Sequence, residues 1–155
     1  MLEKEKINPW TEREITVGEE ANKVQFRFLS RSENVSLARL LAAAAVADKD
    51  TTVAELDEIK VAVSEAVSNA IIHGYRNDPG QYVEMSLGVT PQELVIAIHD
   101  DGVGIVDVEE AMRPSFSSDG RMGLGFAFMQ SFMDDVDVAS LPNAGTTVTM
   151  RKKLR

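Results

Sequence analysis

Three polar residues, Glu65, Asn69 and His73, follow one another at intervals of four in an otherwise apolar stretch. Residues four apart project from nearly the same face of a helix, so one helix would present all three side chains together. An asparagine carbonyl is a hard oxygen ligand that suits Mg²⁺, and a glutamate one turn before it could accept a proton from an attacking hydroxyl or water. The same side chains could equally pair with a covering loop or face water, because burying them unpaired would be costly.

Glycine is concentrated in one part of the chain, since five of the ten glycines fall between positions 102 and 125. Gly102 and Gly104 form one pair, and Gly123 and Gly125 form a second. Glycine permits positive φ angles and close backbone approach, which loops that cradle phosphate groups need. The P-loop, dinucleotide-binding and protein-kinase signatures are absent from these positions. Each pair, taken alone, is equally typical of a turn followed by the start of a helix.

Asp100 closely follows a continuous apolar stretch, Leu94 to Ile98, that predicts a buried strand. A carboxylate at the end of such a strand can accept a hydrogen bond from the exocyclic amine of adenine, which would provide selectivity for that base. The sequence Asp100-Asp101-Gly102 is also an ordinary turn former. A calcium-binding EF-hand is excluded, because the oxygen ligands and the closing glutamate are not at the required spacings.

The composition excludes several classes of function. The formal net charge is −9 at pH 7, and phosphate backbones attract lysine and arginine, so we do not expect direct nucleic-acid binding. The chain has no cysteine, which excludes thiol catalysis and disulfides. With only two histidines as further nitrogen ligands, a structural zinc site is not expected either.

The sequence predicts neither a signal peptide nor a membrane-spanning helix. The first 20 residues contain six glutamates and three lysines or arginines, which is not the composition of a signal peptide. The longest uninterrupted apolar run, Leu40 to Ala47, is far shorter than the roughly 20 residues of a membrane-spanning helix. We therefore expect a cytoplasmic protein that does not act in a membrane.

The spacing of apolar residues predicts the elements that must position these side chains. In chain order they are a strand over 24–28, a helix over 33–47, a helix over 52–73, strands over 83–87 and 94–98, a short helix over 107–112, a helix over 123–133, and strands over 136–139 and 146–150. Thr52 and Glu55 form a capping-box pattern where the second helix begins. Because short turns join neighbouring strands, we expect an α+β fold, a two-layer α/β sandwich whose mainly antiparallel sheet is covered on one face by helices.

The length of 155 residues suits a single domain. We expect this domain over residues 22–155, preceded by an N-terminal extension over 1–21 whose role is unknown. The extension has mixed charge and no sustained period, with Trp10 near its middle. It is interpreted either as a flexible tail or as an arm that docks Trp10 on its own domain or on a partner.

Four segments occur in an order that resembles a known superfamily: Glu65–Tyr75, Asp100–Gly104, Met122–Phe126 and Gly145–Thr147. They look like the N, G1, G2 and G3 boxes of the ATPase and kinase superfamily that includes gyrase, heat-shock chaperones, histidine kinases and MutL. The match is closest to the bacterial anti-sigma factor serine-protein kinases, and among these to the sporulation members. The resemblance spans roughly residues 22–153 and implies a Bergerat-type ATP-binding fold.

The resemblance implies a role for each matching residue. Asn69 would hold Mg²⁺, Glu65 would be the general base, and Asp100 would read the adenine. The other implied positions are His73 among the nucleotide contacts, Gly102 and Gly104 in the adenine wall, Gly123 and Gly125 at the phosphates, Arg121 as a lid arginine at the γ-phosphate, Thr146 as support for the adenine contact, and Arg39 in partner contact. The segment from Ile105 to Met122 would form the ATP lid.

The implied function is that of an anti-sigma factor with protein serine kinase activity. It would sequester a sigma factor as a homodimer, and would use ATP and Mg²⁺ to phosphorylate a serine of a small anti-anti-sigma protein. The net charge of −9 suits contact with a basic sigma-factor surface.

Other functions are kept as alternatives. One is an ATP-dependent binding module that sequesters its partner without phosphotransfer. A detached histidine-kinase domain fits less well, because His73 and His99 lie inside the ATP-site segments rather than on a preceding helical hairpin. An ATP-driven clamp would need a transducer domain, for which the chain leaves no space.

Overall fold

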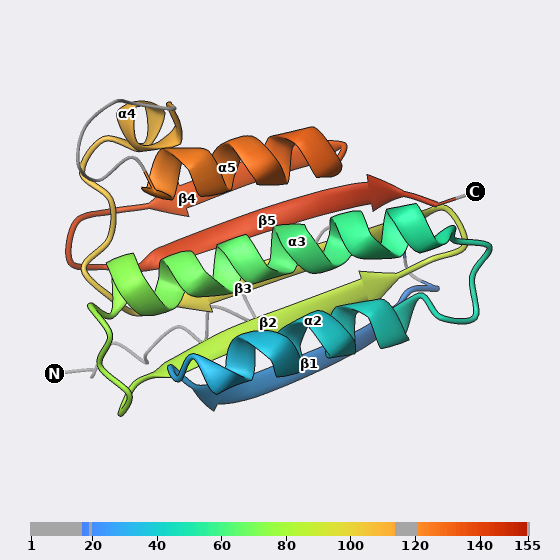
Figure 1. Cartoon of the computed structure of the whole chain (residues 1–155), viewed down its shortest axis with the longest axis horizontal. Helices are drawn as coiled ribbons and strands as arrows, with labels where there is room; N and C mark the ends of the chain where they lie inside the picture. Colours follow the sequence, from blue (N-terminus) through green and yellow to red (C-terminus); the bar gives the residue numbers. More distant parts are fainter. Residues whose placement is uncertain (1–16, 19, 114–120, 155) are drawn as a thin grey trace, which may run out of the picture.

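The computed structural model describes residues 17–18, 20–113 and 121–154. Five antiparallel strands form one sheet in the order β1-β2-β3-β5-β4. The strands are β1 (Asn22–Leu29), β2 (Tyr82–Val89), β3 (Glu93–Asp100), β4 (Asp135–Ser140) and β5 (Thr146–Lys153), and the helices are α2 (Glu33–Ala45), α3 (Val53–Asn69), a π-helical turn η1 (Ala70–Gly74), α4 (Val108–Met112) and α5 (Arg121–Phe132). Helices α2, α3 and α5 lie side by side over one face of the sheet (Figure 1). The predicted two-layer sandwich is confirmed.

The core lies between the sheet and these helices. Side chains alternate between the two faces of a strand, and the register places Phe26 opposite Met85, Met85 opposite Ile98, and Ile98 opposite Val148. Met85, Ile98 and Val148 belong to one buried cluster with the inward face of α3, and Phe26 is partly buried against it. Burial of each such side chain contributes about 1.5–3 kcal/mol, so the row across the strands holds α3 firmly against the sheet.

Side-chain caps are present at the N-termini of two helices, α3 and α4. The Glu55 N–H donates to Thr52 Oγ1 at 3.1 Å, as the capping-box pattern predicts. The Glu110 N–H donates to Asp107 Oδ1 at 3.1 Å at the start of α4. Helix α2 ends at Ala45, before the predicted end at 47, and Val46 beyond it is fully buried. Among the described residues no helix combines the length and the apolar character that crossing a membrane requires.

The end of α3 differs from the prediction of one regular helix to His73. The Tyr75 N–H donates to Ala70 O at 2.9 Å, five residues back, so the last turn is a π-helix rather than an α-helix. Such π turns inside helices occur frequently at functional sites. Here the turn brings Gly74 against the carboxylate of Asp100.

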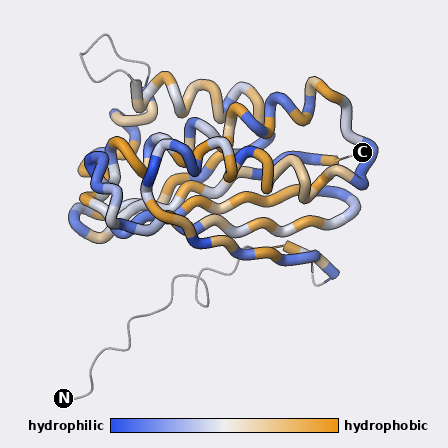
Figure 2. The backbone as a smooth tube through the Cα atoms, turned by 60° about the horizontal axis from the view of Figure 1, so that its bottom comes forward, coloured by the Kyte–Doolittle hydropathy of each residue, from blue (hydrophilic) through white to orange (hydrophobic). Residues whose placement is uncertain are grey.

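The other face of the sheet is called the open face, because no helix of the described part of the chain covers it (Figures 1 and 2). Its central side chains alternate with those of the core and belong to Ser86, Val95, Ala97, His99 and Thr147. Val95 and Ala97 are buried, yet they stand outside the core cluster that contains Leu94, Ile96 and Ile98.

Candidate functional site

A pocket lies between the end of α3, the start of α5 and the ends of β3 and β5. Thirteen residues line it: Ala66, Asn69, Ala70, His73, Gly74, Ile98, Asp100, Gly104, Ile105, Met122, Phe126, Thr146 and Val148. Five of them, Asn69, His73, Asp100, Gly104 and Thr146, are residues that the sequence analysis singled out. An apolar pocket with a few convergent polar groups is the usual form of a ligand site.

Asp100 is the last residue of β3 and is 4% exposed. The Gly102 N–H donates to its Oδ1 at 2.9 Å. A Cβ on Gly74 would stand 2.5 Å from the same oxygen, so only glycine permits this approach of the helix end. Burial raises the pKa of Asp100 to about 6, although the Gly102 hydrogen bond acts in the opposite direction. The carboxylate is therefore held in an apolar wall with limited compensation of its charge.

The loop after Asp100 depends on two glycines. A Cβ on Gly102 would collide with the carbonyl of Gly74, and a Cβ on Gly104 would collide with the carbonyl of Leu141. Gly104 also has a φ of 72°, in the left-handed region that side chains disfavour. The glycines thus bring the loop against η1 on one side and against the β4–β5 turn on the other.

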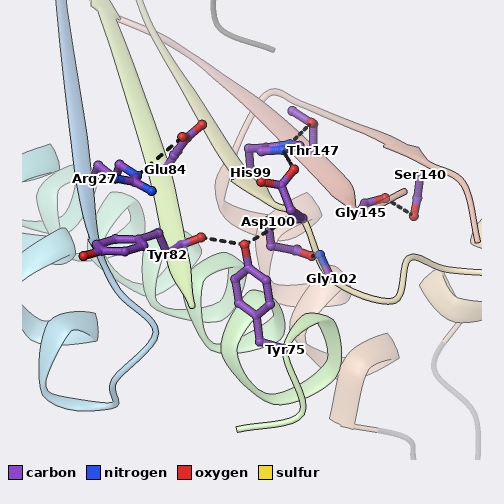
Figure 3. A network of polar contacts seen from close by, with 11 residues as sticks. Arg27, Tyr75, Tyr82, Glu84, His99, Asp100, Gly102, Ser140, Gly145 and Thr147 are labelled. Atoms are coloured by element: carbon purple, nitrogen blue, oxygen red, sulfur yellow. Dashed lines mark hydrogen bonds and ion pairs between the residues drawn. The ribbon is translucent and has the colours of Figure 1, made fainter. Parts of the chain in front are cut away.

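Thr146 begins β5 and lies beside Asp100, its register partner on β3. Its hydroxyl is 2.8 Å from Ser140 Oγ, which accepts from the Ile105 N–H at 2.8 Å. Ser140 Oγ also donates to Gly145 O at 3.0 Å (Figure 3). Ser140 therefore ties the Thr146 hydroxyl to the strand end and to the loop that follows Gly104. Ser140 was not singled out by the sequence analysis.

Glu65 and Asn69 converge on one point of α5. A Cβ on Gly125 would stand 2.9 Å from Glu65 Oε2, 3.4 Å from Asn69 Nδ2 and 3.5 Å from Asn69 Oδ1. Asn69 Nδ2 is buried and has no hydrogen-bond partner among the described residues. Burial raises the pKa of Glu65 above its ordinary value. Glu65 and Asn69 are therefore held close together, and the amide nitrogen of Asn69 can still donate a hydrogen bond to a further group.

The second glycine pair lies inside α5 rather than before it. Arg121 begins this helix, so Gly123 is its third residue and Gly125 its fifth. The first four N–H groups of a helix lack intrahelical partners, a set that includes Gly123 and excludes Gly125. Gly125 leaves room for Glu65 and Asn69, since a Cβ there would crowd both side chains. The side chain of Arg121, and residues 114–120 of the expected lid, lie outside the described part of the chain.

His73 lies on η1 and is half-buried in the pocket wall. The regular i, i+4, i+8 line expected of Glu65, Asn69 and His73 is interrupted by the π turn, yet His73 still faces the same pocket as Asn69. Arg39 is elsewhere: it is exposed on α2, where its guanidinium is 3.4 Å from Ser36 Oγ, and it does not line the pocket.

A polar network supports the pocket from behind β3 (Figure 3). Tyr75 Oη accepts from the Asp101 N–H at 2.7 Å and donates to Tyr82 O at 2.6 Å. The ring of His99 joins Thr147 Oγ1 at 2.8 Å and Asp101 Oδ1 at 2.8 Å. These contacts flank Asp100 in the chain on both sides. The contacts of Tyr75 with Asp101 and of His99 with Thr147 join residues far apart in sequence, so no local signal indicates them.

The described residues contain no group of three or more histidine, aspartate or glutamate side chains that could hold a metal ion alone. Mg²⁺ usually takes only one or two protein oxygens and completes its shell with water and substrate phosphates. The carboxylate of Glu65 and the amide oxygen of Asn69, which converge beside Gly125, fit that kind of partial site.

Comparison with known proteins places the chain in a family. Residues 28–152 match the histidine kinase-like ATPase domain. The anti-sigma F factor of Geobacillus kaustophilus is 48% identical over 136 residues, which cover 86% of this chain and 93% of that protein. The anti-sigma F factor of Clostridium acetobutylicum is 44% identical over 135 residues, which cover 85% of this chain and 94% of that protein.

Solved structures agree on the fold. The RsbU and RsbW domains of a Mycobacterium tuberculosis protein superpose with a TM-score of 0.61 at 15% identity, over 86% of this chain and 32% of that one. The histidine kinase domain of a blue-light activated kinase from Erythrobacter litoralis gives 0.52 at 21% identity, over 77% of this chain and 61% of that one. With a sandwich of this topology, a pocket at the four predicted boxes and relatives of this similarity, the chain belongs to the histidine kinase-like ATPase domain family and, within it, to the anti-sigma F factors.

Proposed function

We propose that this chain sequesters a sigma factor and uses Mg²⁺ and ATP to phosphorylate a serine of an anti-anti-sigma protein. Besides family membership, one observation carries the proposal. Glu65 and Asn69 converge beside Gly125, and Asn69 lines a pocket that also contains the buried carboxylate of Asp100. A nucleotide whose base lies at Asp100 would have its phosphates near a carboxylate, an amide and the first turn of α5.

The adenine end of the site would be built on Asp100. Its carboxylate accepts a hydrogen bond from the exocyclic amine, and the apolar lining of Ile98 and Val148 excludes water from that contact. Gly102 and Gly104 shape the wall around it, and Thr146, held by Ser140, supports the contact from β5. We assign His73 to the wall between this end and Asn69.

At the phosphate end, Asn69 would hold Mg²⁺ through its carbonyl oxygen. The metal-bound nucleotide, when present, supplies the γ-phosphoryl group and neutralises part of the charge that develops on it. The N–H of Gly123, in the first turn of α5, would meet phosphate oxygens there. Arg121 is proposed as a further phosphate contact. These donors offset the net negative charge of the chain at the one place where an anion must bind.

Glu65 would be the general base. As the serine oxygen of the partner forms its bond to phosphorus and the bond to the β-phosphate oxygen breaks, the carboxylate of Glu65 accepts the serine proton. The desolvation that raises the pKa of Glu65 makes it a better proton acceptor than an exposed glutamate. General-base help of this kind is worth about 10²–10⁴ in rate.

Partner binding is proposed for a different surface. Arg39 is flanked on α2 by two exposed leucines, Leu37 and Leu40, whose side chains are 46% and 61% exposed. An arginine between exposed apolar side chains is typical of a protein interface. We propose that this surface contacts the sigma factor or the anti-anti-sigma protein, that the chain acts as a homodimer in the cytoplasm, and that it contacts neither nucleic acid nor membrane.

The function is tested by isolating the partner. Proteins that co-purify with the tagged chain are identified, and the small partner is incubated with the chain and labelled ATP, followed by mapping of the labelled site. We expect label on one serine. A partner that stays bound to the chain without ever taking up label would instead establish the alternative, an ATP-dependent binding module without phosphotransfer.

The role of Glu65 is tested by Glu65→Gln. This variant should bind ATP within about twofold of the parent, because only the proton acceptor is lost, and should transfer label at least about 100-fold more slowly. Asp57→Asn, on the exposed side of the same helix, is the matched control and should transfer at the parental rate. Normal transfer by Glu65→Gln would remove Glu65 from the mechanism.

A further inference from the structure

The open face of the sheet contains a strip of side chains that are buried without a helix above them. The strip consists of Val95, which is 0% exposed, Ser86 at 2%, Ala97 at 4% and Thr147 at 7%. On the helix-covered face such values follow from packing against α2, α3 and α5, but Val95 and Ala97 do not belong to that core cluster. A neutral strip of small and apolar residues at the centre of a sheet is normally covered by another layer.

Within the described residues, the segment before β1 contacts this face at Val17. Val17 lies against Gly88 of β2, since a Cβ on Gly88 would stand 3.2 Å from Val17 Cγ1 and 3.5 Å from Cγ2. Gly88 is the register partner of Val95, so the contact lies beside the most buried residue of the strip. The missing side chain of Gly88 leaves the space that Val17 occupies.

We propose that the N-terminal arm, residues 1–16, continues from Val17 across the open face and covers the strip formed by Ser86, Val95, Ala97 and Thr147. The arm is long enough, because 16 extended residues reach about 50 Å, whereas the four spacings of a five-stranded sheet span about 19 Å. Ile15 would share the sheet-facing side with Val17, since alternate residues of an extended chain point the same way.

The charges beside the strip are compatible with this occupant. Exposed basic side chains lie on β1, at Lys23 and Arg27, and exposed acidic ones lie on β4, at Asp135 and Asp137. The arm carries both signs, within Glu3–Lys6 and Glu12–Glu14. A mixed-charge segment can therefore cross from one edge to the other with its charged side chains at the edges and its apolar ones, Ile15 among them, over the neutral centre.

The proposal is tested by thiol labelling, which the cysteine-free chain allows. In the full chain carrying Ala97→Cys, the introduced thiol should react slowly with a water-soluble disulfide reagent. Adding Ile15→Asp and Val17→Asp should raise its rate by about tenfold or more, because two apolar contacts of the arm are lost. Thr16→Asp, whose side chain would point away from the sheet, is the matched control and should leave the rate unchanged.

Two reference thiols calibrate the measurement. Ser36→Cys, exposed on α2, should react fast in every background, and Ala62→Cys, buried under the helices, should react slowly in every background. Circular dichroism establishes that each variant is folded. Fast labelling at position 97 in the parental background, or slow labelling that the two aspartates do not change, would overturn the proposal. Protection that grows with protein concentration would overturn it too, because a second copy would then be the cover.

Discussion

The two faces of the sheet are made by the same five strands and differ in almost every other respect. The helix-covered face is apolar and continuous with α3 and α5, and it ends in the pocket around Asp100. The open face has a neutral strip of small and apolar side chains between charged edges, and it ends in the network of His99, Thr147 and Asp101. Strand β3 contributes to both, because Ile98 and Asp100 point to the helices while His99 and Asp101 point away.

This alternation shows how a strand can carry a buried carboxylate and still be held in place. The residues next to the carboxylate in the chain make the contacts that fix the strand end. On the pocket side the Asp100 carboxylate accepts a hydrogen bond from the Gly102 N–H, its one such partner among the described residues. On the open side its neighbour His99 is held by Thr147, and the backbone N–H of Asp101 donates to Tyr75, a residue of the core cluster. The pocket side is therefore left available for a ligand, while these two contacts hold the chain on either side of Asp100. Substitutions on the two faces should differ accordingly.

The largest difference is expected between two Gly→Ala substitutions. In Gly102→Ala the new Cβ meets the backbone of Gly74, which cannot move aside, so we expect a loss of about 3 kcal/mol in the free energy of unfolding and loss of nucleotide binding. In Gly88→Ala on the open face the Cβ meets only the side chain of Val17, so we expect less than about 1 kcal/mol. Urea unfolding measures both, and equal losses would contradict the difference between the faces.

The next effect is the pH dependence of nucleotide binding. Binding of adenine needs the ionised carboxylate, and burial raises the pKa of Asp100 to about 6. Affinity for ATP should therefore be constant well above pH 6 and should fall by about tenfold per pH unit below it. Asp100→Asn should bind weakly with no such fall, which separates Asp100 from titration of the nucleotide itself. Calorimetric titration at a series of pH values measures both, and a parental profile as flat as that of the variant would exclude the assignment.

Stability should change with pH in the opposite direction. The folded pKa of Asp100 lies above its ordinary value of 3.8, so the protonated carboxyl stabilises the fold fully below 3.8 and this contribution is lost as the pH rises through about 6. Asp100→Asn should therefore unfold at a higher temperature than the parent at pH 8, with a smaller difference at pH 4.

The smallest effect is expected from loss of the Tyr75 hydroxyl, which links η1 to the end of β3 beside Asp100. Tyr75→Phe removes the acceptor of the Asp101 N–H and the donor to Tyr82 O, so we expect a loss of about 1–2 kcal/mol in the free energy of unfolding and a several-fold weaker affinity for ATP. Tyr82→Phe is the control, because Tyr82 takes part in this network through its backbone oxygen, which the variant retains. Loss of stability without any change in ATP affinity would show that Tyr75 does not position Asp100.

Much of the fold was predictable because its causes are local. The order of the elements, the antiparallel sandwich and the Thr52 cap follow from period, turn residues and capping chemistry, and all are confirmed. The π turn at the end of α3 was missed, since its i→i−5 hydrogen bond competes with an α-helical one that the same residues could form. Gly74 was accordingly interpreted as a helix stop, whereas its structural importance is the close approach to Asp100.

The candidate site, like the fold, has features that the sequence predicts and features that depend on tertiary contacts. Sequence alone determined which residue types are present and at what local spacing: a glutamate and an asparagine one helical turn apart, an aspartate at a strand end, and two pairs of glycines. Tertiary structure decided what they meet. The contacts of Gly125 with Glu65 and Asn69, of His99 with Thr147, and of Tyr75 with Asp101 join residues 26 or more positions apart. Such contacts depend on strand register and helix packing, which local propensity does not encode.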